Sequence, residues 1–213
     1  MSTTIPHKKL DAIYREQNIQ NALSLLDINK IHIVYFSYYL NWHNFIKTPL
    51  LLATKILNCV TRQKFIDHVA HICNFDFDKN YKLEDVKIFE ATVKYGMVKN
   101  SLLKKLSAFQ GICYVETINQ QVDKVKAREF ESQYYGVPYS KTLAAISGID
   151  IKFLDKAIKP PKGDGGFCSW LEALFLINQD IDIKHIEKGE AIEITPADIY
   201  HGDLGQKKIL FKY

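Results

Sequence analysis

The most informative segment of the chain reads Lys159-Pro-Pro-Lys-Gly-Asp-Gly-Gly-Phe-Cys168-Ser-Trp170 and is followed by the apolar run 171–177. A glycine-rich loop that leads into such a run predicts that Cys168 lies in the first turn of a helix. The first N–H groups of a helix lack intrahelical partners and carry the positive end of its dipole, so they favour thiolate over thiol. This is the usual setting of a cysteine nucleophile, which also needs a base and a third polar group.

The composition indicates an ordinary globular protein. The 213 residues are enough for one buried core, and 47% hydrophobic with 24% charged residues is the average balance. Lys and Arg exceed Asp and Glu by 28 to 24, a net charge of +4, without an Arg/Lys stripe. We therefore expect no nucleic-acid partner, whereas the oligomeric state is not predicted.

No targeting segment is expected. The N-terminus lacks an apolar stretch after its charges, and the longest apolar segment, 49–60, is too short to span a bilayer. The sequence thus predicts a cytoplasmic protein without a signal peptide or an integral membrane segment. Delivery in a phage particle or release by lysis is compatible with this location.

The four cysteines are widely separated and form no Cys-x-x-Cys pair. A structural zinc site of the usual spacing is therefore not expected. Cys59, Cys73 and Cys113 each have apolar neighbours and are predicted to be small buried hydrophobic residues. Only Cys168 follows glycines, and its thiol chemistry needs no metal or cofactor.

The hydrophobic periodicity predicts an α+β fold with a mostly antiparallel central sheet flanked by helices. We expect helices at 9–26, 49–60, 101–106, 122–135, 140–147 and 167–177. We expect strands at 31–39, 65–75, 86–93, 111–118, 191–194 and 208–212, with a loop at 154–166 and a turn at 195–198.

Two histidines lie on the expected strand 65–75. His68 shares one face of it with Ala70 and Ile72, and His71 lies on the other face. The small alanine leaves room for another side chain to approach the ring of His68, which makes it the candidate base. The alternative is that either histidine is an edge or surface residue.

Two glutamates are candidates for the third group. Glu90 lies on the face that Val86 and Ile88 share, where a carboxylate is costly unless it is paired. Glu116 has a similar pattern and competes for the role. The alternative for Glu90 is an edge position with its carboxylate in solvent.

Tyr139 follows a turn set by Gly136 and Pro138, so it is expected either to line a pocket or to pack in the core. Trp170 is expected to pack rather than to contact a substrate.

Five segments in order resemble the circularly permuted branch of the NlpC-type papain-like hydrolases, the YiiX-like group related to the lecithin retinol acyltransferase-like enzymes. They are Lys30-Ile-His-Ile-Val-Tyr-Phe36, Asp67-His-Val-Ala70, Ile88-Phe-Glu-Ala-Thr-Val-Lys-Tyr-Gly-Met-Val98, Gly136-Val-Pro-Tyr-Ser140 and Phe167-Cys-Ser-Trp-Leu-Glu-Ala173. A Thr195-Pro-Ala-Asp-Ile199 turn is also similar to the family's. The resemblance covers about 30–213 and implies a permuted papain-like catalytic domain there, with 1–29 as an N-terminal helical extension.

The resemblance implies a triad in the order His68, Glu90, Cys168, with Glu90 preferred to Glu116 because it occupies the family's Glu-Ala position. Asp67 replaces the usual serine, Trp170 stands where a glutamate is common, and the first strand lacks its Gly-Asp opening.

The thiol, histidine and glutamate together with this resemblance predict a cysteine peptidase or amidase. The resemblance implies a cell-wall-type peptide as its substrate. One alternative is a lipid acyl hydrolase or acyltransferase, with segment 45–57 as a lipid-facing surface. The other is a non-catalytic interaction protein with a structural Cys168.

Overall fold

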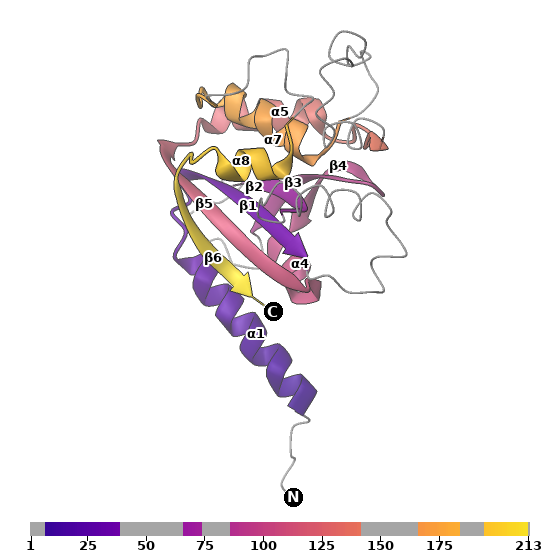
Figure 1. The fold of residues 1–213 in the computed structure, drawn as a ribbon, viewed down its shortest axis with the longest axis vertical. Helices are drawn as coiled ribbons and strands as arrows, with labels where there is room; N and C mark the ends of the chain where they lie inside the picture. Colours follow the sequence, from indigo (N-terminus) through magenta and orange to yellow (C-terminus); the bar gives the residue numbers. More distant parts are fainter. Residues whose placement is uncertain (1–6, 39–65, 74–85, 142–165, 184–193, 213) are drawn as a thin grey trace, which may run out of the picture.

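A computed structural model describes residues 7–38, 66–73, 86–141, 166–183 and 194–212 (Figure 1). Its centre is a six-stranded sheet in the order β4-β3-β2-β1-β5-β6, in which every neighbouring pair is antiparallel. The strands are β1 (Lys30–Tyr38), β2 (His68–Ile72), β3 (Lys87–Thr92), β4 (Gly96–Ser101), β5 (Gly111–Gln121) and β6 (Gln206–Lys212).

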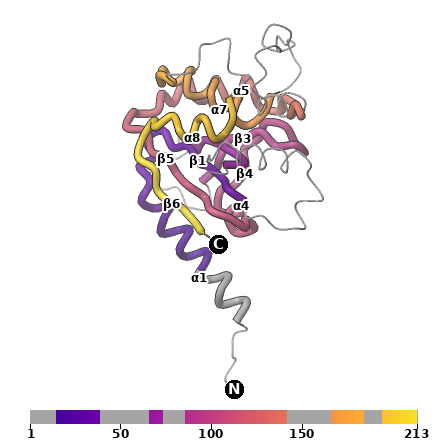
Figure 2. The backbone as a smooth tube through the Cα atoms, viewed as in Figure 1, coloured from indigo at the N-terminus to yellow at the C-terminus, as the bar shows by residue number. Residues whose placement is uncertain are grey.

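Helices cover both faces of the sheet, as the backbone trace in Figure 2 also shows. One face carries α5 (Lys124–Tyr134), α7 (Cys168–Asn178) and α8 (Pro196–His201). The opposite face carries α1 (His7–Ser24) and α4 (Leu102–Ala108). The core therefore has two layers, one on each side of the strands.

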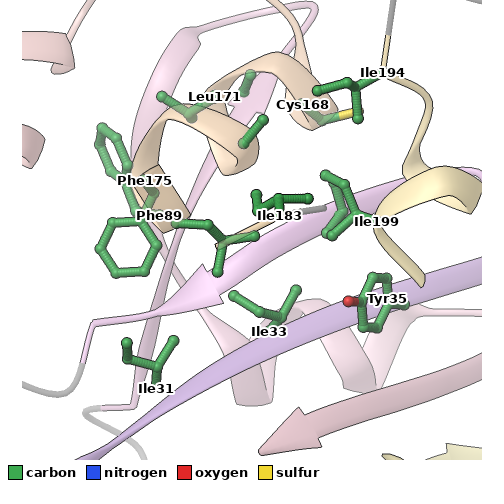
Figure 3. Packing of buried hydrophobic residues seen from close by; sticks show 14 of the residues in the cluster. Ile31, Ile33, Tyr35, Phe89, Cys168, Leu171, Phe175, Ile183, Ile194 and Ile199 are labelled. Carbon is green, nitrogen blue, oxygen red and sulfur yellow. The ribbon is translucent and has the colours of Figure 1, made fainter. Parts of the chain in front are cut away.

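Alternation along β2 assigns its residues to these two layers. Val69 and Cys73 belong to the cluster under α7, whereas Ala70 and Ile72 belong to the cluster under α1 and α4. Figure 3 shows the first cluster, with Cys168 at the start of α7. The period-two assignment made from the sequence is confirmed for this strand.

The predicted α+β class with an antiparallel sheet flanked by helices is confirmed. The expected elements at 49–60, 140–147 and 191–194 lie wholly or mostly outside the described residues. Strand β4 was not expected. The 195–198 turn was a wrong interpretation, because this segment opens helix α8: Thr195 and Asp198 form a capping box, with Pro196 at the first helical position.

Helix α1 packs on α4 and β6. Ile19 and Leu23 are buried in the α1/α4 layer, and the guanidinium of Arg15 donates to the carbonyls of Leu106 and Phe109 at the end of α4. Within the described parts of the chain, no helix combines the length and apolar character that crossing a membrane requires.

The burial of α1 predicts that Ile19→Ala destabilises the whole fold. Removal of this fully buried side chain leaves a cavity between α1 and the sheet, and such changes cost about 2–5 kcal/mol. Urea unfolding followed by circular dichroism measures the loss. The exposed neighbour Asn18, changed to Ala, is the control and should shift the free energy of unfolding by less than about 0.5 kcal/mol. Equal effects of the two variants would show that α1 contributes little to the core.

Candidate functional site

Cys168 is the first residue of α7, and 7% of its surface is exposed. Phe167, the residue before the helix, makes no side-chain cap, so the first N–H groups of α7 are left for other acceptors. The Cys168 sulfur accepts from one of them, the N–H of Ser169, and also from the N–H of Val69 on β2. It is also hydrogen-bonded to His68.

The residue two positions before α7 must be a glycine, Gly166. A Cβ there would lie 2.2 Å from the Trp170 ring, which packs over this position and against Tyr134. The Gly166 carbonyl accepts from Ser140 N–H at 2.8 Å, and its N–H donates to Pro138 at 3.1 Å. These bonds hold the half-buried Tyr139 beside the residues that lead into α7 and its thiol.

His68 begins β2 at the point where β2 and β3 separate. Among the described residues, β2 and β3 pair at Ile72 with Ile88 and at His71 with Phe89, and Cys73 N–H donates to the carbonyl of Lys87 at 2.9 Å. Beyond this pairing, the His68 ring bonds to Glu90 of β3, with 2.5 Å between Nε2 and Oε2. Because Nε2 is occupied by Glu90, Nδ1 is the ring nitrogen available to the Cys168 thiol.

Glu90 is 1% exposed and is held by three side chains. Besides His68, Asn100 Nδ2 donates to Oε1 at 2.9 Å, and the ammonium of Lys105 bonds to Oε2. Burial raises the pKa of Glu90, but His68 and Lys105 outweigh it and lower the pKa to about 2. The carboxylate is therefore charged at neutral pH despite its burial.

The pKa values of the thiol and the imidazole move in opposite directions. Burial raises the pKa of Cys168, but the bond to His68, the charge on His68 and the two N–H groups lower it by more. Burial and the charge of Lys105 lower the pKa of His68, but its bonds to Cys168 and Glu90 raise it by more. Both shifts favour a thiolate–imidazolium pair.

Two other candidates from the sequence lie elsewhere. Glu116 is fully buried on β5, where it accepts from Tyr35 Oη at 2.5 Å and from Gly205 N–H at 2.7 Å, and pairs with Lys207 at 2.9 Å. These contacts join β5 to Tyr35 of β1, to Gly205 and to Lys207 of β6, so Glu116 is engaged on the side of β1 and β6 and not with His68. The surface alternative for His71 is wrong, because its side chain is fully buried.

Three further side chains now have defined contacts. Asp67 Oδ2 accepts from Tyr38 N–H at 2.8 Å and so fixes the end of β1 beside the site. Burial first, and then the Cys168 charge, raise the pKa of Tyr139. Trp170 packs as expected.

Asn100 and Lys105 were missed by the sequence reasoning. Asn100 lies on the unexpected β4, directly across from Ile88, and Lys105 is one of two adjacent lysines on α4. A partner for a buried Glu90 was required, but neither residue is marked by its own sequence pattern.

Among the described residues, no group of three or more His, Cys, Asp or Glu side chains is arranged to hold a metal ion. Comparisons with protein-family models, with curated proteins and with solved structures find no match.

Lys105→Met tests the electrostatics around Glu90. The variant leaves the buried carboxylate without its ammonium, which should cost about 1–3 kcal/mol of stability. The charge of Lys105 also lowers the pKa of His68, so that pKa should rise in the variant. Titration of the His68 ring by NMR and thermal unfolding measure the two effects. Lys104→Met on the exposed side of the same helix should change neither, and an unaltered His68 titration in both variants would contradict the assigned role.

The buried His71 predicts a pH dependence of stability. Burial lowers its pKa, but Glu172 and Glu131 outweigh this and raise it to about 9. A raised pKa in the folded state stabilises the fold fully below the unfolded value of 6.5, and the gain is lost as the pH rises through 9. Relative to the His71→Gln variant, the free energy of unfolding of the wild type should fall by on the order of 3 kcal/mol between pH 6 and pH 10. Urea unfolding across this range measures the difference, and a constant difference would show that folding does not raise the pKa of His71.

Proposed function

We propose that the protein is a cysteine hydrolase in which Cys168 is the nucleophile, His68 the acid and base, and Glu90 the group that orients His68. The observation that carries this proposal is the hydrogen-bonded series from Cys168 through His68 to Glu90, with the sulfur at the start of α7. Sulfur, imidazole and carboxylate in this order form the usual unit of thiol catalysis.

The reaction that fits this series is acyl transfer through a thioester. The Cys168 thiolate attacks the carbonyl carbon of an amide, and His68 gives its proton to the leaving amine. His68 then removes a proton from water, which attacks the thioester and releases the acid and the thiolate. Glu90 stays ionised and stabilises the imidazolium. The N–H of Cys168 at the helix start is the candidate donor to the oxyanion, and Tyr139 is a candidate wall of the substrate pocket.

The antiparallel sheet with the Cys168 helix packed against β2, and the order His68, Glu90, Cys168 along the chain, support a permuted papain-like arrangement. The substrate that we propose is an amide in a cell-wall-type peptide. Ester or thioester cleavage of a lipid acyl chain uses the same three side chains and is the alternative. Segment 45–57, on which that alternative rests, lies outside the described residues.

Labelling with iodoacetamide at pH 6 tests the nucleophile. Since a thiolate is required, the wild type should be modified at Cys168, and Cys168→Ala should lose this modification. His68→Ala should slow it by at least about tenfold, because the thiol loses the partner that lowers its pKa. Mass spectrometry of tryptic peptides identifies the labelled cysteine.

Cys113→Ala is the matched control, because burial raises the pKa of this fully buried thiol. It should leave the labelling unchanged. Modification of another cysteine in preference to Cys168, or a Cys168 thiol that titrates at its ordinary value, would favour the non-catalytic interaction protein instead.

Hydrolysis of a panel then separates the substrate classes. A peptide with a cell-wall-type amide bond should be cleaved by the wild type but not by Cys168→Ala. Turnover of a long-chain acyl thioester alone would replace the peptide substrate with the lipid one.

A further inference from the structure

A second group of charged side chains lies between α7 and the sheet, on the side of β2 opposite to Ala70. His71 Nδ1 of β2 is 3.0 Å from Glu172 Oε2 of α7, and its Nε2 is 3.6 Å from Glu131 Oε1 of α5. Lys99 Nζ of β4 lies 2.6 Å from Glu131 Oε2. His71, Glu131 and Glu172 are buried and Lys99 is 27% exposed, so four elements meet through a group of charges that is largely shielded from water.

Helix α7 holds the His71 ring from two sides. Glu172 pairs with its Nδ1, and the Phe175 ring stacks on it with 3.6 Å between centroids and 5° between planes. Cys168, Glu172 and Phe175 have the spacing i, i+4, i+7, which places them on one face of the helix. That face therefore contacts β2 at His68 through Cys168 and at His71 through the other two residues.

We propose that His71 and Glu172 are a positioning pair that sets the orientation of Cys168 against His68. The inference rests on the thiol chemistry proposed above. Neither residue touches the reacting atoms, so their effect on catalysis passes through the placement of α7 on β2.

The physical reason is that two separate contacts fix the orientation of a helix on a strand, whereas one contact does not. The two contacts here are Cys168 with His68 and Glu172 with His71. They lie four residues apart on the helix, about 6 Å, and three residues apart on the strand, about 10 Å. Helix α7 is also held by the apolar packing of Leu171 and Leu176 and by the bond from Ser169 Oγ to the carbonyl of Ile194. The contact between His71 and Glu172 adds a polar restraint on rotation of the helix about its first turn, and a hydrogen bond between thiol and imidazole is sensitive to small rotations.

The charges of His71 and Glu172 make their contact depend on how α7 is placed on β2. A buried ion pair adds little net stability compared with apolar residues of similar volume, but it strongly disfavours arrangements that separate its members. Glu172 Oε2 is the atom of α7 that meets His71, while Lys99 and His71 both lie within ion-pair distance of Glu131. Moving α7 away from β2 would separate the charges of Glu172 and His71 inside the protein.

Glu172→Gln is the first test, with the pH profile of iodoacetamide modification at Cys168 as the readout. The amide keeps the size of the side chain and removes its charge. We expect the pH midpoint of modification to rise by about one unit, which lowers the rate at pH 6 about tenfold. A loss of packing alone would lower the melting temperature without moving this midpoint.

The double variant His71→Leu/Glu172→Leu separates placement from stability. It replaces the buried pair with apolar side chains, a change that often preserves or raises stability. The pH midpoint should still rise, while the melting temperature stays near that of the wild type. This variant keeps the inference testable if Glu172→Gln alone fails to fold.

Gln179→Leu is the matched control at the other end of α7. Gln179 is 2% exposed, and its Oε1 accepts from Asp123 N–H at 2.8 Å, so the variant also removes a buried polar contact of this helix. It should leave the midpoint unchanged. An unaltered midpoint in the two pair variants, or an equal rise in the control, would overturn the positioning role. If the wild-type thiol itself titrates at its ordinary value, the proposed function fails instead, so the two failures are distinguishable.

Discussion

The burial of negative charge is the constraint on which this structure depends. The described residues include four buried glutamates, Glu90, Glu116, Glu131 and Glu172. Each of them meets a cation from a different element, respectively Lys105, Lys207, Lys99 and His71. An unpaired carboxylate in the interior is costly, so none of these elements can move far from its partner without a penalty. The elements that carry the candidate site are therefore joined by charge as well as by apolar packing.

Much of the sheet could be predicted from the sequence, because the residue types in a short run are a local property. Strands β1, β2 and β3 are continuous runs of mostly buried residues, as expected for strands covered on both faces, and β5 alternates over part of its length. The sequence pattern alone could not decide whether Glu90 or Glu116 is the partner of His68, since both lie at similar positions in similar strands. The strand order separates them: β3 is next to β2, whereas β5 lies beyond β1. No local pattern contains that order.

Most of the missed features depend on partners that a segment's own apolar pattern does not reveal. Strand β4 has only two apolar residues, Met97 and Val98, and it is a strand because all six of its residues pair with β3. The burial of His71 likewise depends on α5 and α7. Helix α8 is the exception, since the spacing of Thr195, Pro196 and Asp198 already matched a helix start and was interpreted as a turn.

The wide spacing of the candidate triad along the chain has a consequence for biosynthesis. His68 and Glu90 are both present once β3 has been made, but Cys168 follows His68 by 100 residues. Contacts of such long range form late, because closing a long loop costs entropy before the contact is gained. A nascent or unfolded chain therefore carries an ordinary, weakly acidic thiol. The contacts that lower the pKa of Cys168 exist only when α7 has docked on β2, so this lowered pKa belongs to the finished fold and is absent during synthesis.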